Sequence, residues 1–463
     1  MKIVFAVPPI ESKKGYPTAT QSRQFQYLKD PTFIYPIVPA LAMTMLIEAD
    51  QEVLWIDCVA DNLTDVEFGR VIIQMKPDYI VFESPTPIIK RYWEIIDGIK
   101  HNLPEIKSVL CGAHVTALPA ESIEKSKVDI VLNGGKWPFD LFKLITGKDW
   151  EKGKLLPHIN RDVTRWWLYA YKNGNFQYIP ATYIMSSVDC WHRPGCTFCS
   201  WGDYFKEYSL RPVEDVLDEI EELINKGFKE IFDDSGTFPT GAWLKTFCRE
   251  MKERGYSDHI SLGCNMRFGA LEDQDYLLLH DAGFRMILWG LESVHQKTLD
   301  ILNKGYNIKS VSHDLILSKA AGIKNHITVM FGYPWESLDK AKQTFNTVKW
   351  MLLNGWAWSA QATICVPYPG TILYEYCKEQ NLLITEDWSE YDMSRAIMKI
   401  PYEEKELFKL QKGIYDIAYH PKFIWNKLKD IKSIDDLKYY FRLGRKIYDR
   451  FGQFRTIGKI SQD

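Results

Sequence analysis

Residues 181–202 read ATYIMSSVDCWHRPGCTFCSWG, and this stretch decides the architecture of the chain. Its first eight residues are rich in β-branched and aliphatic side chains, a composition typical of a buried strand. Three cysteines follow within ten residues: Cys190, Cys196 and Cys199. The sequence therefore predicts a strand that leads directly into a loop with three thiols.

The number and spacing of these thiols indicate the kind of site. Three thiolates from one loop can hold three irons of a cubane cluster and leave the fourth iron without a protein ligand. A closed zinc site normally needs four nitrogen or sulfur donors, and His192 lies between two of the candidates, where the loop hinders simultaneous binding. The other cysteines are isolated in sequence: Cys58, Cys111, Cys248, Cys264, Cys365 and Cys377. A zinc ribbon and inert buried thiols stay as alternatives, and the spacing favours the cluster.

The CxxC pair with Phe198 inside it, preceded by a third cysteine, resembles the cluster loop of radical SAM enzymes. The resemblance implies that Cys190, Cys196 and Cys199 hold a [4Fe-4S] cluster whose free iron binds S-adenosylmethionine (SAM). It also implies reductive cleavage of SAM to a 5'-deoxyadenosyl radical. The chain departs from the family in its first spacing, which has five residues where three are usual. A Pro-Gly pair in this spacer can form a wider turn, so the ligands stay assigned while the subfamily stays open.

Composition limits the class of protein. A chain of 463 residues is expected to hold about two to three domains. With 46% hydrophobic and 25% charged residues it is typical of a globular protein, and a net charge of -3 gives no reason to expect a nucleic-acid partner. Nine cysteines without a signal peptide predict a reducing cytoplasm. No apolar run approaches the roughly 20 residues of a membrane-spanning helix.

The first 145 residues alternate between strand and helix patterns. Strands are expected in KIVFAVPP, EVLWIDCVA, DYIVFESP, IKSVLCGA and VDIVLNGG. Helices are expected at Ala40 to Glu48, Asp65 to Met75, Lys90 to Asn102 and Pro119 to Lys127. This alternation predicts an α/β domain over residues 1–145, with a doubly wound, Rossmann-like parallel sheet that binds ligands at the carboxyl ends of its strands.

Small and polar residues gather at those strand ends. Because no GxGxxG follows the first strand, a nicotinamide site is disfavoured. Through the stretches YPIVPALAM and GAHVTALP, and through its place ahead of the barrel, the domain resembles the cobalamin-binding domain of B12-dependent radical SAM enzymes. The resemblance implies that cobalamin is lined by Ser84, Thr86, Gly112, Ala113, His114 and Gly134. An empty structural lid is the alternative.

The residue that would bind cobalt differs from the family pattern. The DxHxxG motif, by which many cobalamin domains supply a histidine to cobalt, is missing from the loop after the first strand, which contains no histidine. We therefore predict a cobalamin without a histidine on its lower face. His114 is interpreted as a lining residue rather than a cobalt ligand.

The central region predicts a partial barrel. Residues 146–180 are interpreted as a linker, and residues 181–370 as a partial (β/α)6 radical SAM barrel. After ATYIMSSV, strands are expected in EIFDDS, HISLGCNMR, RMILWGLES, HITVMFGYP and SAQATICVPYP. Amphipathic helices separate them; in the first of these, Val213, Val216, Leu217, Ile220, Leu223 and Ile224 share one face. Chemistry is expected at the carboxyl end of the barrel.

The ends of these strands match positions that bind SAM in the family. The resemblance implies that Asp233 and Asp234 accept hydrogen bonds from the SAM ammonium and that Arg267 approaches its carboxylate. It places Glu292 near the ribose or sulfonium, and Gly332 and Phe198 against the adenine. For the acidic residues the alternative is helix capping or surface charge.

Residues 371–463 are expected to form a helical cap. From Pro421 to Ile460 there are eleven Lys or Arg residues against four Asp, with aromatic residues interspersed. Such a basic segment is compatible with contact at an anionic membrane surface, but the sequence favours a cap that closes the open side of the partial barrel.

The resemblance also implies a reaction. Most members of the family methylate an unactivated carbon through methylcobalamin, and others form rings or oxidise substrates without methyl transfer. A catalytically silent cobalamin carrier or sensor is a third alternative, and a methylthiotransferase is disfavoured because the first domain lacks three clustered cysteines. The expected partners are a small-molecule or lipid-like substrate and a reductant such as flavodoxin or ferredoxin.

Overall fold

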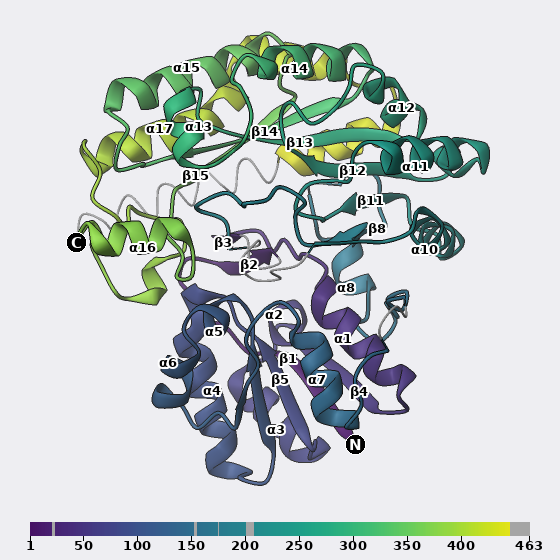
Figure 1. The fold of residues 1–463 in the computed structure, drawn as a ribbon, viewed down its shortest axis with the longest axis vertical. Coiled ribbons are helices and arrows are strands. Elements are labelled where there is room, and N and C mark those ends of the chain that lie inside the picture. Colours follow the sequence, from purple (N-terminus) through teal and green to yellow (C-terminus); the bar gives the residue numbers. More distant parts are fainter. Residues whose placement is uncertain (21–23, 152–154, 175, 201–207, 445–463) are drawn as a thin grey trace.

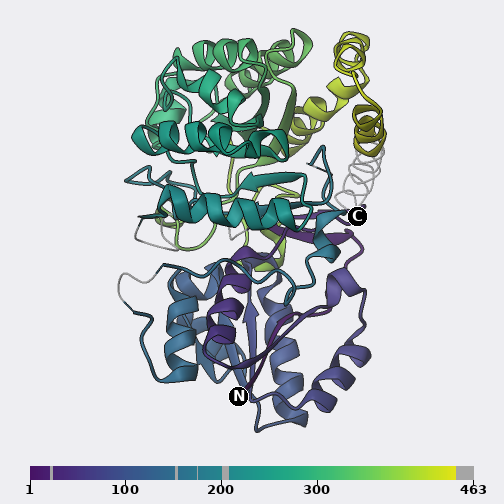
Figure 2. The ribbon, with the colours of Figure 1, turned by 90° about the vertical axis from the view of Figure 1, so that its right-hand side faces the viewer.

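The computed structural model describes residues 1–20, 24–151, 155–174, 176–200 and 208–444. Two α/β lobes are stacked along the long axis of the molecule, and the hairpin β2–β3 lies between them (Figure 1). Figure 2 shows the same two lobes after a quarter turn. Each lobe is built on a parallel sheet, which confirms the predicted fold class.

The amino-terminal lobe is a five-stranded parallel sheet in the order β4-β1-β5-β6-β7. Its strands are β1 (Lys2–Val7), β4 (Glu52–Asp57), β5 (Tyr79–Glu83), β6 (Lys107–Cys111) and β7 (Ile130–Val131). Its helices are α1 (Ile37–Glu48), α2 (Cys58–Asp61), α3 (Asp65–Met75), η1 (Thr86–Ile88), α4 (Ile89–Asn102), α5 (Ala113–Ala117), α6 (Pro119–Lys125) and α7 (Trp137–Thr146). Because helices cover both faces, Ile3, Val4 and Phe5 of β1 are all buried. The chain order reverses between β1 and β5, and a crevice is expected at the carboxyl ends of these two strands.

The connection between β1 and α1 contains a hairpin that the sequence does not predict. Strands β2 (Tyr16–Thr20) and β3 (Gln24–Leu28) pair antiparallel. The Nζ of Lys14, at the base of this hairpin, lies 2.5 Å from Oδ2 of Asp392 in the carboxyl-terminal region. The hairpin is therefore tied to a segment that follows the barrel.

The second lobe is a six-stranded parallel sheet in the order β15-β14-β13-β12-β11-β8. Its strands are β8 (Ala181–Ile184), β11 (Glu230–Asp233), β12 (Ser261–Met266), β13 (Phe284–Glu292), β14 (Lys324–Phe331) and β15 (Ser359–Ile364). A short antiparallel pair, β9 (Ser187–Val188) with β10 (Ser209–Leu210), stands beside it. The strands follow one another in chain order, as the predicted partial (β/α)6 barrel requires.

Helices cover the outside of this sheet. They are α10 (Val213–Asn225), α11 (Ala242–Glu253), η2 (Tyr256–Asp258), α12 (Asp275–Asp281), α13 (Gln296–Ile301), α14 (Ser310–Ala320) and α15 (Leu338–Leu353). The predicted face of α10 is confirmed at its centre, where Val216, Leu217, Ile220 and Leu223 are buried.

The described part of the carboxyl-terminal segment is helical, as expected. It comprises α16 (Ile372–Glu379), η3 (Trp388–Glu390), α17 (Glu404–Asp416), η4 (Ile417–Tyr419), α18 (Pro421–Lys429) and a further helical stretch at residues 434–444. The Oη of Tyr415 in α17 donates to the carbonyl of Ala362 at 3.0 Å and accepts from its N–H at 3.2 Å. Helix α17 thus covers the outer edge of β15 and closes the open side of the sheet. The rest of the predicted cap, residues 445–463, lies outside the described residues.

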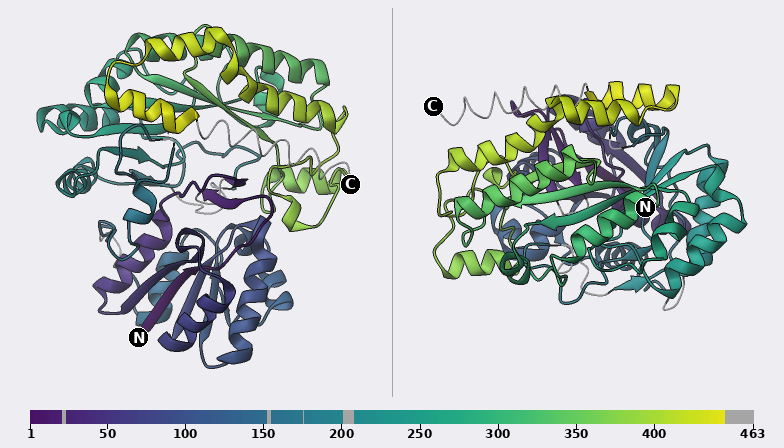
Figure 3. Two further views of the ribbon diagram at one scale, coloured as in Figure 1. Left: turned by 180° about the vertical axis from the view of Figure 1, so that it is seen from behind. Right: turned by 90° about the horizontal axis from the view of Figure 1, so that it is seen from above.

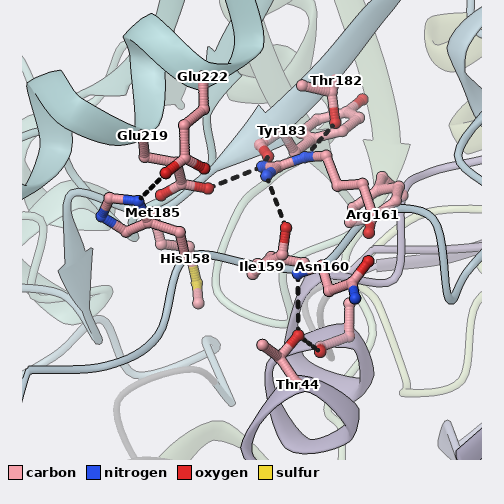
Figure 4. A network of polar contacts seen from close by, with 12 residues as sticks. Thr44, His158, Ile159, Asn160, Arg161, Thr182, Tyr183, Met185, Glu219 and Glu222 are labelled. Atoms are coloured by element: carbon pink, nitrogen blue, oxygen red, sulfur yellow. Dashed lines mark hydrogen bonds and ion pairs between the residues drawn. The ribbon is translucent and has the colours of Figure 1, made fainter. Parts of the chain in front are cut away.

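The segment between the lobes contains α8 (Trp167–Ala170) and a buried polar network (Figure 4). The N–H of Asn160 donates to Oγ1 of Thr44 in α1 at 3.0 Å. Arg161 donates from Nη2 to Oε1 of Glu219 in α10 at 2.9 Å, and Nη1 of Arg211 contacts the other oxygen of Glu219 at 2.6 Å. Burial opposes the charge of Glu219, but the two guanidinium groups outweigh this cost and lower its pKa to about 2. The network fixes the connecting segment to both lobes.

No helix among the described residues is both long and apolar enough to cross a membrane.

Candidate functional site

The three-thiol loop leaves the carboxyl end of the first barrel strand. Asp189, directly before Cys190, is buried and adopts a left-handed φ of 73°. Its Oδ1 accepts from the N–H of Cys190 at 2.6 Å, and its carboxylate pairs with Arg193. Trp191 donates from Nε1 to the carbonyl of Phe238 at 3.0 Å. The long first spacer is therefore held in a defined turn by its own side chains.

Residues 301–305, at the end of α13, bind the other side of this loop. The Nδ2 of Asn303 donates to the carbonyls of Pro194 and Gly195 at 2.7 and 3.0 Å. The N–H of Thr197 donates to the carbonyl of Leu302 at 3.0 Å. His192 contacts the carbonyl of Asn303 through Nε2 at 2.6 Å. This histidine anchors the loop to the residues that follow α13.

A buried ion pair lies beside the loop. Glu292, at the end of β13, has a left-handed φ of 61° and follows a register shift in the strand. Its Oε1 lies 3.1 Å from Nζ of Lys304, and both side chains are below 10% exposed. A Cβ on Gly290 would lie 2.7 Å from that Oε1 and 2.8 Å from that Nζ. The glycine of the GLES stretch therefore provides the space in which the pair forms.

Lys304 is a candidate site residue that the sequence did not indicate. Its Nζ lies 5.8 Å from the centroid of the Phe198 ring. Burial opposes the ammonium charge, but Glu292 and the thiols of Cys196 and Cys199 favour it, and the pKa of Lys304 ends above its usual value. The only sequence signal is its place after α13, in the stretch NKG. The loop of thiols therefore faces a fixed positive charge.

Arg267 supplies a second cation near the thiols, just past the end of β12. Its guanidinium lies 5.1 Å from the Trp191 ring, and its Nη1 donates to the carbonyl of Gly305 at 2.5 Å. The buried Nε has no hydrogen-bond partner among the described residues. A Cβ on Gly305 would lie 2.7 Å from Cε1 of His192 and 3.0 Å from Nη1 of Arg267. Gly305 thus lets the loop and Arg267 approach each other.

The other residues predicted to contact SAM differ in how many hydrogen bonds they already make within the protein. Asp233 is buried and accepts from the N–H groups of Ser186 and Ser235 at 2.9 and 3.0 Å, while burial raises its pKa. It thus ties β8 to β11. Asp234, one residue further on, accepts a hydrogen bond through Oδ1 from Nδ2 of Asn265 at 3.4 Å. The N–H of Gly332 donates to Oη of Tyr402 at 3.2 Å, so the carboxyl-terminal segment already uses that donor.

The three cysteines form no disulfide bonds and are partly buried. Burial is the largest influence on Cys196 and raises its pKa, while Lys304 acts in the opposite direction. Among the described residues, no three His, Cys, Asp or Glu side chains are grouped closely enough to hold a metal ion. The donor set nevertheless fits an iron-sulfur cluster, because three thiols outside any disulfide share one loop and two cations face them.

A cavity of about 140 Å³ lies at the carboxyl edge of the amino-terminal sheet, where the chain order reverses. It is lined by residues of β1, β4, β5 and the hairpin, and its wall is mainly aromatic, including Phe5, Phe25, Phe33, Trp55, Tyr92 and Trp137. The Nε1 of Trp137 is buried and has no hydrogen-bond partner among the described residues. The wall of the cavity thus offers mainly large apolar surfaces, as ligand sites often do.

Of the six residues predicted to line cobalamin, only Ser84 is among the residues that line this cavity. A Cβ on Gly112 would lie 2.7 Å from the Ser84 carbonyl oxygen, so the ends of β5 and β6 approach closely there. Thr86 is buried in η1, Ala113 begins α5, and Gly134 donates its N–H to Oγ1 of Thr116 at 2.8 Å.

His114 does not line the cavity. Its ring is fully buried, with centroids 6.1 and 5.4 Å from those of Trp93 and Trp388. Its Nε2 lies 3.1 Å from Oε2 of Glu121. The side chain therefore joins the amino-terminal lobe to the segment around η3.

Comparison with known proteins gives a family for the barrel. Residues 184–348 match the family model described as the Radical SAM superfamily. An uncharacterized methyltransferase of Pyrococcus horikoshii is 24% identical over 93% of this chain and 95% of its own length. An anaerobic magnesium-protoporphyrin IX monomethyl ester cyclase of Cereibacter sphaeroides is 23% identical over 74% of this chain, which spans 60% of that protein.

Solved structures extend the likeness to both lobes. TsrM of Kitasatospora setae, a radical SAM methyltransferase with cobalamin and a [4Fe-4S] cluster bound, has a TM-score of 0.62 and 17% identity over 82% of this chain and 78% of that one. OxsB, a cobalamin-dependent SAM radical enzyme with aqua-cobalamin and SAM bound, has a TM-score of 0.66 and 14% identity over 97% of this chain and 71% of that one. At these identities the likeness shows a shared fold.

Proposed function

We propose, from the match of residues 184–348 to the model of the Radical SAM superfamily, that the protein is a cobalamin-dependent radical SAM enzyme. We propose methyl transfer to an unactivated carbon as its reaction. The observation that carries the proposal is the loop of three thiols, held between β8 and the residues that follow α13 and facing the buried Glu292–Lys304 pair. The Pyrococcus horikoshii relative named methyltransferase supports the choice of reaction.

In this proposal Cys190, Cys196 and Cys199 hold a [4Fe-4S] cluster. When bound, the cluster and cobalamin supply electron transfer to SAM and carriage of a methyl group. Lys304 and Arg267 place positive charge beside the thiols and are suited to the SAM carboxylate. Phe198 offers an apolar surface to the adenine, and Asp234 offers acceptors to the ammonium.

We propose that cobalamin binds in the cavity at the carboxyl edge of the amino-terminal sheet. Residues of the hairpin β2–β3 and a mainly aromatic wall surround the cavity, which suits a large ligand with extensive apolar surface. None of the described residues that line this cavity is a histidine. This supports a cobalamin without a histidine on its lower face.

Ring formation or oxidation without methyl transfer is a second candidate. It is favoured by the two relatives named anaerobic magnesium-protoporphyrin IX monomethyl ester cyclase. Both candidates use the same barrel site and differ in the fate of the SAM methyl group. The substrate proposed for either reaction is a small molecule, and the electron donor is a flavodoxin or ferredoxin.

The first test measures SAM cleavage by the protein reconstituted without oxygen. We expect 5'-deoxyadenosine with a strong reductant, and none from Cys199→Ala, because that variant lacks one of the three thiolates. Cys248→Ala is the matched control, since this buried cysteine lies in α11. If Cys199→Ala still forms 5'-deoxyadenosine, the assigned cluster is wrong.

A second test separates the two reactions and the silent carrier. The protein loaded with hydroxocobalamin is treated without oxygen with a strong reductant, which brings the cobalt to the Co(I) state that can accept a methyl group. It is then given SAM with a deuterated methyl group, and the cobalamin is analysed by mass spectrometry. Deuterated methyl on cobalamin supports methyl transfer. Cleavage of SAM without this label supports ring formation or oxidation, and no cleavage with bound cobalamin supports a carrier. EPR of the partly reduced protein would show nitrogen splitting on the cobalt signal if a histidine were bound.

A further inference from the structure

The last two helical stretches of the described chain share one anchor on the barrel. Lys427 in α18 lies with its Nζ 3.9 Å from the centroid of the Trp358 ring, and Tyr439 in the stretch 434–444 stacks on the same ring at 5.9 Å. Asp430, in the turn between them, accepts from Nε1 of Trp358 at 3.2 Å. These contacts define an inner face for both helices. Figure 3 shows them on the outside of the barrel lobe.

The opposite side of these helices is apolar and exposed. Ile434, Leu437 and Phe441 follow one another at helical spacing and are 73%, 58% and 78% exposed. In α18, which has no buried residue, Trp425 and Leu428 are 57% and 55% exposed. We call these five residues, together with Ile424, the outer face. Six large apolar side chains on two neighbouring helices are more than scattered surface residues, and such groups mark interaction sites.

The charges around the outer face are mainly positive. Lys422, Lys429, Lys432 and Lys438 are exposed. The carboxylates of the same segment turn mostly inward: Asp430 contacts Trp358, and Asp436 accepts from Nε2 of Gln177 at 2.6 Å. Only Asp435 is an exposed acid among described residues 421–444, where it pairs with Lys438 at 3.2 Å. The surface is therefore more basic than the composition alone indicates.

We propose that the outer face docks on the surface of an anionic lipid bilayer. Helices that carry Trp, Phe and Leu flanked by lysines bind in the interface plane, with the apolar side chains in the acyl boundary and the cations at the headgroups. The Nζ of Lys429 already lies 5.2 Å from the Trp425 ring centroid. In that position the ammonium can remain at the headgroups while the indole enters the membrane. The charge complementarity favours anionic lipid over an uncharged apolar partner.

The inner-face contacts make this docking compatible with the rest of the fold. Because Lys427, Asp430 and Tyr439 hold the helices on Trp358, the outer face is presented without unfolding the cap. The anchor lies against Trp358, just before β15, and thus at the end of the barrel opposite the thiol loop, which leaves β8 at its carboxyl end. Membrane contact would therefore leave the loop of thiols accessible.

The test is sedimentation of the full chain with vesicles of phosphatidylcholine, with and without phosphatidylglycerol. We expect binding to the vesicles that contain phosphatidylglycerol, weaker binding to pure phosphatidylcholine, and loss of binding in high salt, because surface attraction is screened beyond about 10 Å at 0.1 M salt. The triple variant Ile434→Ser, Leu437→Ser, Phe441→Ser should bind about tenfold more weakly. Val66→Ser, Leu277→Ser is the matched control, since these exposed apolar residues lie on α3 and α12.

Three outcomes would overturn the proposal. The first is that the unaltered chain does not sediment with anionic vesicles, and the second is that the triple variant binds as well as the control. The third is a dimer of the unaltered chain, found by light scattering, that becomes a monomer in the triple variant; the outer face would then bind a second copy. Circular dichroism and thermal unfolding of both variants establish that any loss of binding does not come from unfolding.

Discussion

Glu292 combines two unfavourable features, a strained backbone conformation and a buried carboxylate, and Lys304 compensates the second. A non-glycine residue with a left-handed φ carries strain of about 1–3 kcal/mol, and a buried carboxylate is unfavourable unless it is paired. Lys304 provides the pair at 3.1 Å. A strained residue kept in place by a buried partner is typical of a functional position. The pair therefore sets the position of a carboxylate and an ammonium beside the thiol loop.

We predict that Gly290→Ala weakens SAM binding at least about tenfold, because the new Cβ would displace Oε1 of Glu292 or Nζ of Lys304. Isothermal titration of the anaerobically reconstituted protein with SAM measures the effect. Gly98→Ala is the control: a Cβ there meets nothing within 4 Å, and alanine favours its helix α4 by about 1 kcal/mol. Equal SAM affinity in both variants would show that the Glu292–Lys304 pair does not contribute to SAM binding.

Some residues of the candidate site are predictable from the sequence and others are not, for a physical reason. Thiols at close spacing and a glutamate in GLES carry their signal locally, in a short motif. Lys304 is one of 57 Lys and Arg residues, and nothing in its neighbourhood distinguishes it. Its burial and its contact with Glu292, 12 positions earlier, are properties of the folded barrel. The same applies to Asn303, whose two bonds to the thiol loop cross more than a hundred residues.

At the scale of elements, the strands of both sheets are predictable because they are continuous apolar runs bounded by turn residues. The hairpin β2–β3 is not, since YPTAT contains a proline and QFQYL has no apolar run. Its position is determined by contacts with distant residues, such as Lys14 with Asp392. The position of the cavity at the carboxyl ends of the strands follows from the predicted sheet, but the part of its wall that the hairpin supplies could not be predicted for the same reason.

Helix α10 contributes a charged residue to the interior, and we predict that Glu219→Gln destabilises the fold. Removing this carboxylate leaves Arg161 and Arg211 without their common partner, and breaking such a buried pair costs about 3–5 kcal/mol. Urea unfolding at neutral pH measures the change in free energy. The control is Glu222→Gln on the same helix, where the side chain is 63% exposed and pairs with His158. A loss as small as that of the control would mean that the network does not hold the lobes together.

The same residue gives this element a pH dependence. The pKa of Glu219 is lowered from 4.5 to about 2 in the folded state. Its stabilisation is therefore fully present above pH 4.5 and is lost as the pH falls towards 2. The difference in unfolding free energy between the unaltered protein and Glu219→Gln should be constant above pH 5 and should shrink below about pH 4.5. A difference that stays constant down to pH 3 would contradict the lowered pKa.

At the scale of the whole molecule, three segments distant in sequence meet at the amino ends of the barrel strands. Gln177 of the segment between the lobes accepts from Nζ of Lys324 in β14 at 2.8 Å. Its Nε2 donates to Oδ1 of Asp436 at 2.6 Å. Glu230 in β11 pairs with Arg285 and accepts from the N–H of Gln177 at 2.8 Å. The linker, the barrel and the carboxyl-terminal helices are thus joined by one polar network. The protonation state of this network should affect the stability of the entire chain.

Lys324 makes this joint sensitive to alkaline pH. Burial lowers its pKa from 10.5 to about 8, and the nearby Arg285 adds to the effect. Between these two values the unfolded chain binds more protons than the folded one, so the stability from this group rises with pH. We expect the unfolding free energy of the unaltered protein, relative to that of Lys324→Met, which has no titrating group there, to rise by about 2 kcal/mol between pH 8 and pH 10. Buried cysteines and tyrosines with raised pKa values, such as Tyr439 at about 12, act in the opposite direction in both proteins and cancel in this difference. The measurement is urea unfolding of both proteins across this range; parallel curves would show that Lys324 keeps its ordinary pKa and that the joint does not depend on pH.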